Sequence, residues 1–237
     1  MLDLLQGSFS LTYVVISYIL GISILLKYFK FKTRDYIFVG IAWMGISNAW
    51  LGDALSFLMI IFMGSTLNPM IYFIVAYASI PFFILCWLIA FTDLLYPDEQ
   101  KSFLSIFLIF TAFYEVHFFY LLFTDPSLMG IFVGVFRIRW TFFMEIYFSI
   151  FILITIITGI MFAQVSIKSH NPEVSLKGKL ILLAFISFSI SAVVEAFGHL
   201  SPLTVVITRI ILISSSIEFY LGFILPRRFR NFFLKEE

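Results

Sequence analysis

The chain has 237 residues, of which 62% are hydrophobic and only 12% are charged, whereas about a quarter of the residues in a soluble domain are charged. This composition excludes an ordinary soluble domain and indicates an integral membrane protein. The net charge of +1 provides no long-range field that would recruit nucleic acid, and the single cysteine, Cys86, excludes an intrachain disulfide.

Seven apolar runs are long enough to cross a bilayer, which takes roughly 20 residues. In chain order they are 8–29, 36–63, 69–95, 102–123, 131–163, 179–199 and 202–225. Continuous runs of this length are typical of helices and exclude a β-barrel, whose strands are short and alternating. The sequence therefore predicts an all-α protein, with a single seven-transmembrane-helix bundle over residues 1–225. A short basic and aromatic cytoplasmic tail, 226–237, follows it.

Prolines mark several helix boundaries. Pro69 and Pro202 each follow a residue that caps helices, so they are expected at the first helical position. Pro226 closes the last run. Pro81 lies in the middle of the third run, where it is expected to kink the helix.

The basic residues predict the orientation in the membrane. All but three of them fall in the loops and tail on one side of the seven-span arrangement, whereas the opposite loops hold none. The residues on the basic side are Lys27, Lys30, Lys32, Arg34, Lys101, Lys168, Lys177, Lys179, Arg227, Arg228, Arg230 and Lys235. Because loops rich in Lys and Arg stay in the cytoplasm, we expect a multi-pass protein of the cell membrane, with its N-terminus outside and its C-terminus in the cytoplasm.

Ionisable residues inside the predicted spans gather in the outer half of the membrane. They are Asp53, Glu115, His117, Arg137, Arg139, Glu145, Glu195, His199 and Arg209. Each such group costs about 2.5–3.5 kcal/mol on insertion scales, so it needs a partner or a wet cavity. These residues are the candidate ligand-binding residues, and we expect Arg209 to pair with Glu195 or Asp53.

Helical spacing indicates that these groups face other helices. The polar and small residues recur at intervals of three or four: Ser191, Glu195 and His199; Arg137, Thr141, Glu145 and Ser149; Gly45, Ala49, Asp53 and Ser56. Small residues allow close helix contact and polar ones hydrogen-bond across it. The pattern predicts a polar core in the outer half of the bundle, closed below by apolar and aromatic side chains. Such a core either binds a ligand or is a self-neutralising network that only fixes helix packing.

Known catalytic and metal motifs are weak in this sequence. Glu195 and His199 lie four residues apart and could supply two metal ligands. Glu115 and His117 point about 200° apart on a helix, so they cannot both face one ion. No further histidine lies in a span, and no nucleophile or phosphate-loop motif occurs. These signals favour neither a bound metal nor an enzyme, and a metal-dependent enzyme stays only as the third alternative.

Seven spans with an external N-terminus are also the topology of microbial rhodopsins and of G-protein-coupled receptors, and the topology is all that is shared. A retinal Schiff base needs a lysine in the middle of the seventh helix, where this chain has Arg209 and Glu218. The sequence therefore argues against retinal and predicts no cofactor.

Three functions remain open from the sequence. The first is a receptor-like or sensor-like protein that binds a small-molecule ligand or a proton in the outer polar core. Since the predicted loops hold no soluble domain, a signal would pass to a cytoplasmic partner or through a homo-oligomer. The alternative is a small-solute or ion carrier or channel that uses the same charges, and the third is an intramembrane metal-dependent enzyme. All three are surrounded by the lipid bilayer, and none binds nucleic acid.

Overall fold

A computed structural model describes residues 2–197 and 201–234. Within them, seven helical segments are long and apolar enough to cross a membrane. They are Asp3–Phe31, Asp35–Met63, Pro69–Leu95, Gln100–Thr124, Phe142–Ile167, Pro172–Phe197 and Leu203–Ile224. The predicted all-α seven-helix bundle is thus confirmed, and the fifth span is the one whose start differs most from the prediction.

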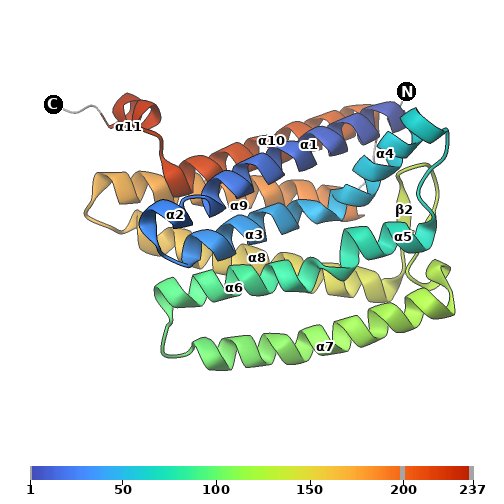
Figure 1. Cartoon of the computed structure of the whole chain (residues 1–237), viewed down its shortest axis with the longest axis horizontal. Coiled ribbons are helices and arrows are strands. Elements are labelled where there is room, and N and C mark those ends of the chain that lie inside the picture. Colours follow the sequence, from blue (N-terminus) through green and yellow to red (C-terminus); the bar gives the residue numbers. More distant parts are fainter. Residues whose placement is uncertain (1, 198–200, 235–237) are drawn as a thin grey trace.

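The elements follow one another as a simple series of antiparallel spans (Figure 1). The first three spans comprise α1 (Leu2–Leu25) and α2 (Tyr28–Phe31), then α3 (Asp35–Ile46), η1 (Ser47–Trp50) and α4 (Leu51–Met63), then α5 (Pro69–Phe73), η2 (Ile74–Ala78) and α6 (Ile80–Leu95). After these come α7 (Gln100–Thr124), η3 (Pro126–Leu128), β1 (Gly130–Phe132), β2 (Ile138–Trp140), α8 (Phe142–Ile167), α9 (Pro172–Phe197), α10 (Pro202–Ile224) and α11 (Arg227–Phe233).

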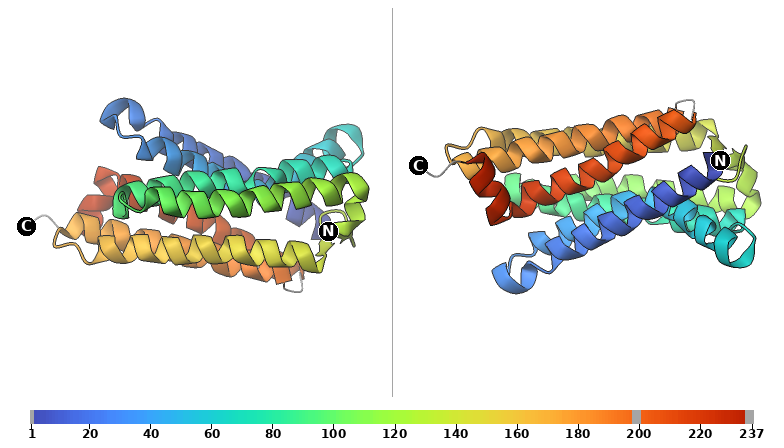
Figure 2. Two further views of the ribbon diagram at one scale, coloured as in Figure 1. Left: turned by 90° about the horizontal axis from the view of Figure 1, so that it is seen from below. Right: turned by 90° about the horizontal axis from the view of Figure 1, so that it is seen from above.

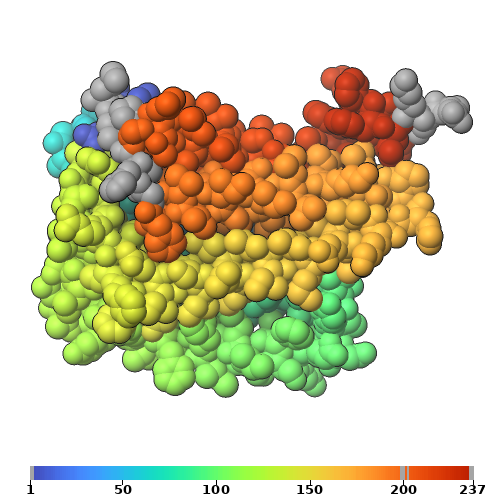
Figure 3. All heavy atoms as spheres, turned by 180° about the vertical axis from the view of Figure 1, so that it is seen from behind, coloured from blue at the N-terminus to red at the C-terminus, as the bar shows by residue number. Residues whose placement is uncertain are grey.

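Six of the spans form a closed ring. Neighbours around the ring are α1, α3, α6, α8, α9 and α10, and α10 packs back against α1. Figure 3 shows α8, α9 and α10 as adjacent bands on one face of the molecule. The remaining span, α7, lies outside the ring, where it packs against α6 and touches α8 through aromatic rings such as Tyr114 and Tyr147.

The two ends of the bundle differ in character (Figures 1 and 2). The start of α1 and the β1–β2 hairpin lie at one end, called here the hairpin end. The short helix α11 lies at the other, the tail end, and exposes Phe229, Phe232 and Phe233. Because the spans alternate in direction, the basic loops after α1, α6 and α8 fall at the tail end.

The fifth span is shorter than predicted. Residues 130–140 form an antiparallel hairpin with Ile131 opposite Arg139, and α8 begins only at Phe142. Arg137 and Arg139 therefore lie in a hairpin at the end of the bundle and not on a membrane helix. The predicted helical stripe of Arg137, Thr141, Glu145 and Ser149 is wrong at its first two residues, because Thr141 precedes α8 in an extended conformation. The physical reason is that strand pairing within the hairpin satisfies backbone groups outside the span.

Two spans are interrupted at positions that contact each other. The second span tightens into a 3-10 turn over Ser47–Trp50, and the third widens into a π-helical segment over Ile74–Ala78. The Asn48 side-chain amide donates to Ser79 Oγ at 3.1 Å, and Tyr18 donates to Asn48 Oδ1 at 2.6 Å. The sequence predicted the second interruption, through Pro81, but not the first.

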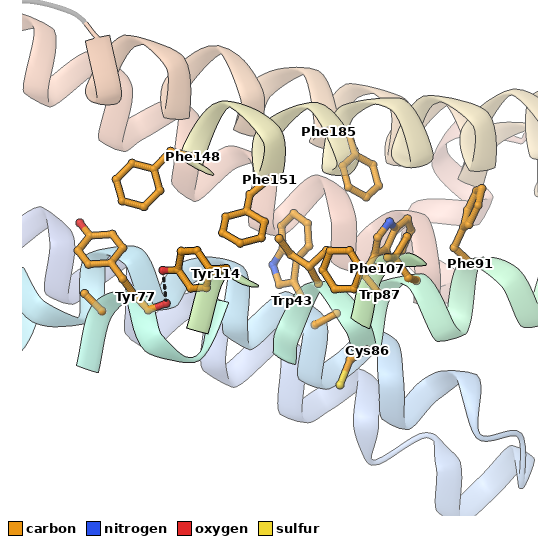
Figure 4. Packing of buried hydrophobic residues seen from close by; sticks show 14 of the residues in the cluster. Trp43, Tyr77, Cys86, Trp87, Phe91, Phe107, Tyr114, Phe148, Phe151 and Phe185 are labelled. Atoms are coloured by element: carbon orange, nitrogen blue, oxygen red, sulfur yellow. Dashed lines mark hydrogen bonds between the residues drawn. The ribbon is translucent and has the colours of Figure 1, made fainter. Parts of the chain in front are cut away.

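The π-helical segment is held by α7. Pro81 has no N–H, so it cannot donate the bond that the Tyr77 carbonyl accepts in a regular helix. The Tyr114 hydroxyl donates to this carbonyl instead, at 3.1 Å, and the Ser79 amide also approaches it. Tyr114 is fully buried, and Figure 4 shows its hydroxyl directed at the Tyr77 backbone.

Large aromatic residues fill the middle of the bundle (Figure 4). Trp43 of α3 stacks on Phe219 of α10, with ring centroids 3.6 Å apart and planes 9° from parallel. Phe185 of α9 and Trp87 of α6 pack around this pair, and Trp87 donates to Thr158 at 2.8 Å. These rings, called here the aromatic layer, come from four spans and separate the hairpin half of the bundle from the tail half.

Candidate functional site

A buried ion-pair cluster lies in the hairpin half. Arg209 of α10 is 1% exposed, and its Nη1 donates to both carboxylate oxygens of Glu195 on α9, at 2.7 and 2.6 Å. Its Nη2 lies 3.6 Å from Asp53 Oδ2 on α4. The expected pairing of Arg209 with Glu195 and Asp53 is therefore confirmed, with Glu195 as the closer partner.

Neutral side chains complete the shell of the two carboxylates. Tyr72 donates to Asp53 Oδ1 at 2.6 Å, and Ser10 of α1 donates to Asp53 Oδ2 at 3.3 Å. Trp50 Nε1 donates to Glu195 Oε2 at 2.6 Å, and the Arg209 guanidinium lies 5.6 Å from the centroid of the Trp50 ring. Buried carboxylates need such donors, since an unpaired charge in a low-dielectric interior is costly.

A cavity of about 550 Å³ adjoins this cluster. Asp53, Glu195 and Trp50 line it, whereas Arg209 is not among its lining residues. The cavity also includes exposed lining residues such as Val133 and Arg139, so it reaches the molecular surface at the hairpin end. Arg209 thus binds the two carboxylates on the side away from the cavity, and Asp53 and Glu195 form part of the cavity wall.

Aromatic rings make up much of the rest of the wall. Tyr77, Trp140 and Phe148 all line the cavity and touch one another, with ring centroids 4.8–5.1 Å apart. Phe151, Ile84 and Thr155 line its side toward the aromatic layer. The arrangement is typical of small-molecule sites, which combine apolar walls with a few placed polar groups.

The β1–β2 hairpin covers the cavity at its end. The Gln6 amide on α1 donates to the Phe136 carbonyl at 2.9 Å and ties the hairpin to the bundle. Arg137, Arg139 and Glu145 line the cavity, and none of them forms an ion pair within the residues that the structure describes. The Arg137 Nε is buried without a hydrogen-bond partner there.

Two of the expected residues do not line the cavity, and a third is not among the residues that the structure describes. Glu115 and His117 lie on α7, outside the ring of six spans, and His117 Nδ1 is 3.1 Å from the Tyr147 hydroxyl. The expectation that they join one polar core with Asp53 and Glu195 is therefore wrong, because α7 packs on the outer side of α6. The expectation for His199 lies outside the described residues.

The chain matches no protein-family model and no curated protein. The function must therefore be argued from the site itself.

Several residues at the site were not found from the sequence. Gln6, Ser10, Trp50, Tyr72 and Tyr77 all contribute. Two of them belong to α1, and Gln6 precedes the apolar run predicted for residues 8–29. The spacing of Gln6 and Ser10, four residues apart on one helical face, was the available signal. The aromatic residues gave no such signal, because the chain has aromatic rings in every span.

No cluster of three or more His, Cys, Asp or Glu side chains that could hold a metal occurs within residues 2–197 and 201–234. Glu195, one of the two candidate ligands in its helix, is occupied by Arg209 and Trp50.

Proposed function

We propose that this protein is a receptor-like or sensor-like membrane protein that binds a small ligand in the cavity at the hairpin end. The observation that carries the proposal is a cavity of about 550 Å³ lined by five acidic or basic side chains and by aromatic rings. A network that only fixed packing would need no such space beside it. We further propose that the tail end, which carries the basic loops, faces the cytoplasm.

The arrangement favours a closed pocket over a pathway. A transport path needs polar stepping points in both halves of the bilayer. In the tail half, Glu218 accepts a hydrogen bond from Ser214 at 2.6 Å on its own helix, and Asp93 pairs with Arg34 at 2.6 Å. The aromatic layer lies between these groups and the cavity, so the carrier alternative has less support.

The interrupted spans support a sensing role. Ile46, Ala49 and Trp50, at or beside the 3-10 turn, line the cavity, as does Tyr77 in the π-helical segment. Short 3-10 and π-helical stretches inside long helices often mark hinges and functional sites. A ligand in the cavity would contact both interruptions. At these two points the second and third spans can bend, and such a bend would move their tail-end segments.

The first test concerns access to the cavity. In a Cys86→Ser background, Ala49→Cys places a thiol on the cavity wall, and Ala90→Cys places one at a fully buried position away from it. We expect methyl methanethiosulfonate to modify the first on the order of 100-fold faster, because only a hydrated thiol ionises readily. Equal rates in the purified protein would contradict a water-filled cavity.

The second test separates receptor from carrier. Purified protein in liposomes should show no proton or ion flux above that of empty liposomes, since the aromatic layer closes the cavity from the tail half. A flux that Glu218→Gln abolishes would instead establish the carrier alternative. The matched control is Glu173→Gln, which removes a carboxylate at the tail end whose partners are Lys177 and Arg230.

A further inference from the structure

We propose that the ligand of this cavity is an organic ammonium ion, bound against the wall formed by Gln6, Asp53, Glu195 and the rings beside them. This inference rests on the proposed function and specifies the chemical class of its ligand.

A residue of this wall carries a buried acceptor without a partner. Gln6 is 3% exposed and lines the cavity, and its Nε2 is used by the Phe136 carbonyl. Its Oε1 is buried and accepts no hydrogen bond within the described part of the chain. A buried acceptor without a donor costs about 1–3 kcal/mol. A small rotation of the Gln6 side chain toward the cavity that it lines would let a ligand N–H supply this donor.

Gln6 lies near the two carboxylates along α1. Gln6 and Ser10 lie one turn apart on the same face of α1, and Ser10 donates to Asp53. Gln6 is therefore about one turn nearer the hairpin end than Asp53. The unpaired acceptor and the acidic wall thus belong to one region of the cavity.

The charge of the wall favours a cation. Asp53 and Glu195 carry two negative charges, and Arg209 behind them supplies one positive charge. The cluster therefore has a net charge of −1 on the cavity side. A monovalent cation neutralises it, whereas an anion is repelled.

The rings around this wall suit an organic cation better than a metal ion. Trp50 and Tyr72 donate to the carboxylates through their polar atoms, which fixes each ring next to a negative charge. Tyr77, Trp140 and Phe148 form a three-ring group on another part of the wall. Aromatic faces attract ammonium groups through their quadrupoles and surround the apolar remainder of the ligand.

The alternative to an ammonium ligand is an anion bound near the arginines of the hairpin. Arg137 and Arg139 lie on the hairpin and Glu145 lies in the first turn of α8, so these three groups bring a net charge of +1 to the covered end. A purely anionic ligand would have to bind there, away from the acidic wall. The two possibilities therefore predict opposite charge preferences for ligands of the same shape.

Three probes that share a phenethyl group and differ in their head group distinguish them: phenethylammonium, 3-phenylpropionate and 2-phenylethanol. Each is added at the same concentration to the purified protein, and its dissociation constant is taken from the rise in melting temperature. We expect the cation to bind at least about 10-fold more tightly than the other two. Gln6→Leu should raise the dissociation constant of the cation by about 10-fold. Thr12→Ala, which changes an exposed polar residue on the same helix, should leave this dissociation constant unaltered.

Each other outcome overturns the ammonium proposal. Tighter binding of 3-phenylpropionate, lost in Arg137→Gln, would place an anion at the hairpin. Equal binding of all three probes, abolished by the cavity-filling change Ala196→Phe, would leave the pocket as a ligand site without this charge preference. Failure of the cation to bind, while methyl methanethiosulfonate still reaches Ala49→Cys, would likewise reject the ammonium ion. In these last two cases the proposed function stands.

Discussion

Arg209→Leu should lower the melting temperature of the purified protein by roughly 6–20 °C. Its side chain is 1% exposed and pairs with Glu195 at 2.6 Å, so the change leaves two carboxylates buried without their cation. Breaking a buried ion pair in this way costs about 3–5 kcal/mol, and 1 kcal/mol corresponds to about 2–4 °C in a protein of this size. Thermal unfolding in detergent measures the effect.

A control variant and two double variants test whether Arg209 stabilises the protein through the two carboxylates. Arg34→Leu removes an arginine from an exposed pair with Asp93, where the arginine side chain is 62% exposed, and should cost at most about 1 kcal/mol. Adding Glu195→Gln to Arg209→Leu should recover much of the loss, and more than Asp53→Asn, because Glu195 is the closer partner. No recovery by either change would mean that the carboxylates are not what Arg209 stabilises.

Trp43→Ala should destabilise the protein by about 3–5 kcal/mol, the usual cost of emptying a packed aromatic site. Trp43 is 2% exposed and stacks on Phe219 at 3.6 Å. Its indole N–H has no hydrogen-bond partner among the described residues, so packing alone accounts for the loss. The melting temperature in detergent measures it.

The control for this change is a ring of similar kind that faces lipid. Phe113 on α7 is 69% exposed, and lipid or detergent chains fill the space that Phe113→Ala leaves. We expect a change within about 0.5 kcal/mol. Similar losses in the two variants would show that the aromatic layer is loosely packed, and it would then no longer separate the cavity from the tail half.

The spans and the main ion pair could be predicted because each depends on a local property. Runs of apolar residues determine which segments cross the membrane. Arg209 and Glu195 lie at similar depths in two spans joined by a short connection, so few other partners were within reach. The pairing followed from depth and charge alone.

The hairpin and the place of α7 could not be obtained in the same way. Residues 131–140 are apolar enough to extend a span, and the alternation of Arg137 and Arg139 with apolar neighbours was the contrary signal. For Glu115 and His117, helical periodicity gives the face of a helix but not its neighbour. Whether that face meets the centre or another helix depends on the order of spans around the ring, which no short pattern encodes.

The hydrogen bond between Tyr114 and the Tyr77 carbonyl has a consequence for biogenesis. The third span is synthesised before the fourth, and its proline leaves the Tyr77 carbonyl without its regular helical donor. In hydrocarbon a carbonyl short of a donor is costly, and beside the Ser79 amide it is Tyr114 on the next span that donates to it. Although α7 lends no side chain to the cavity, its insertion therefore completes the segment that carries Tyr77. The shape of the pocket thus depends on a span that does not itself line it.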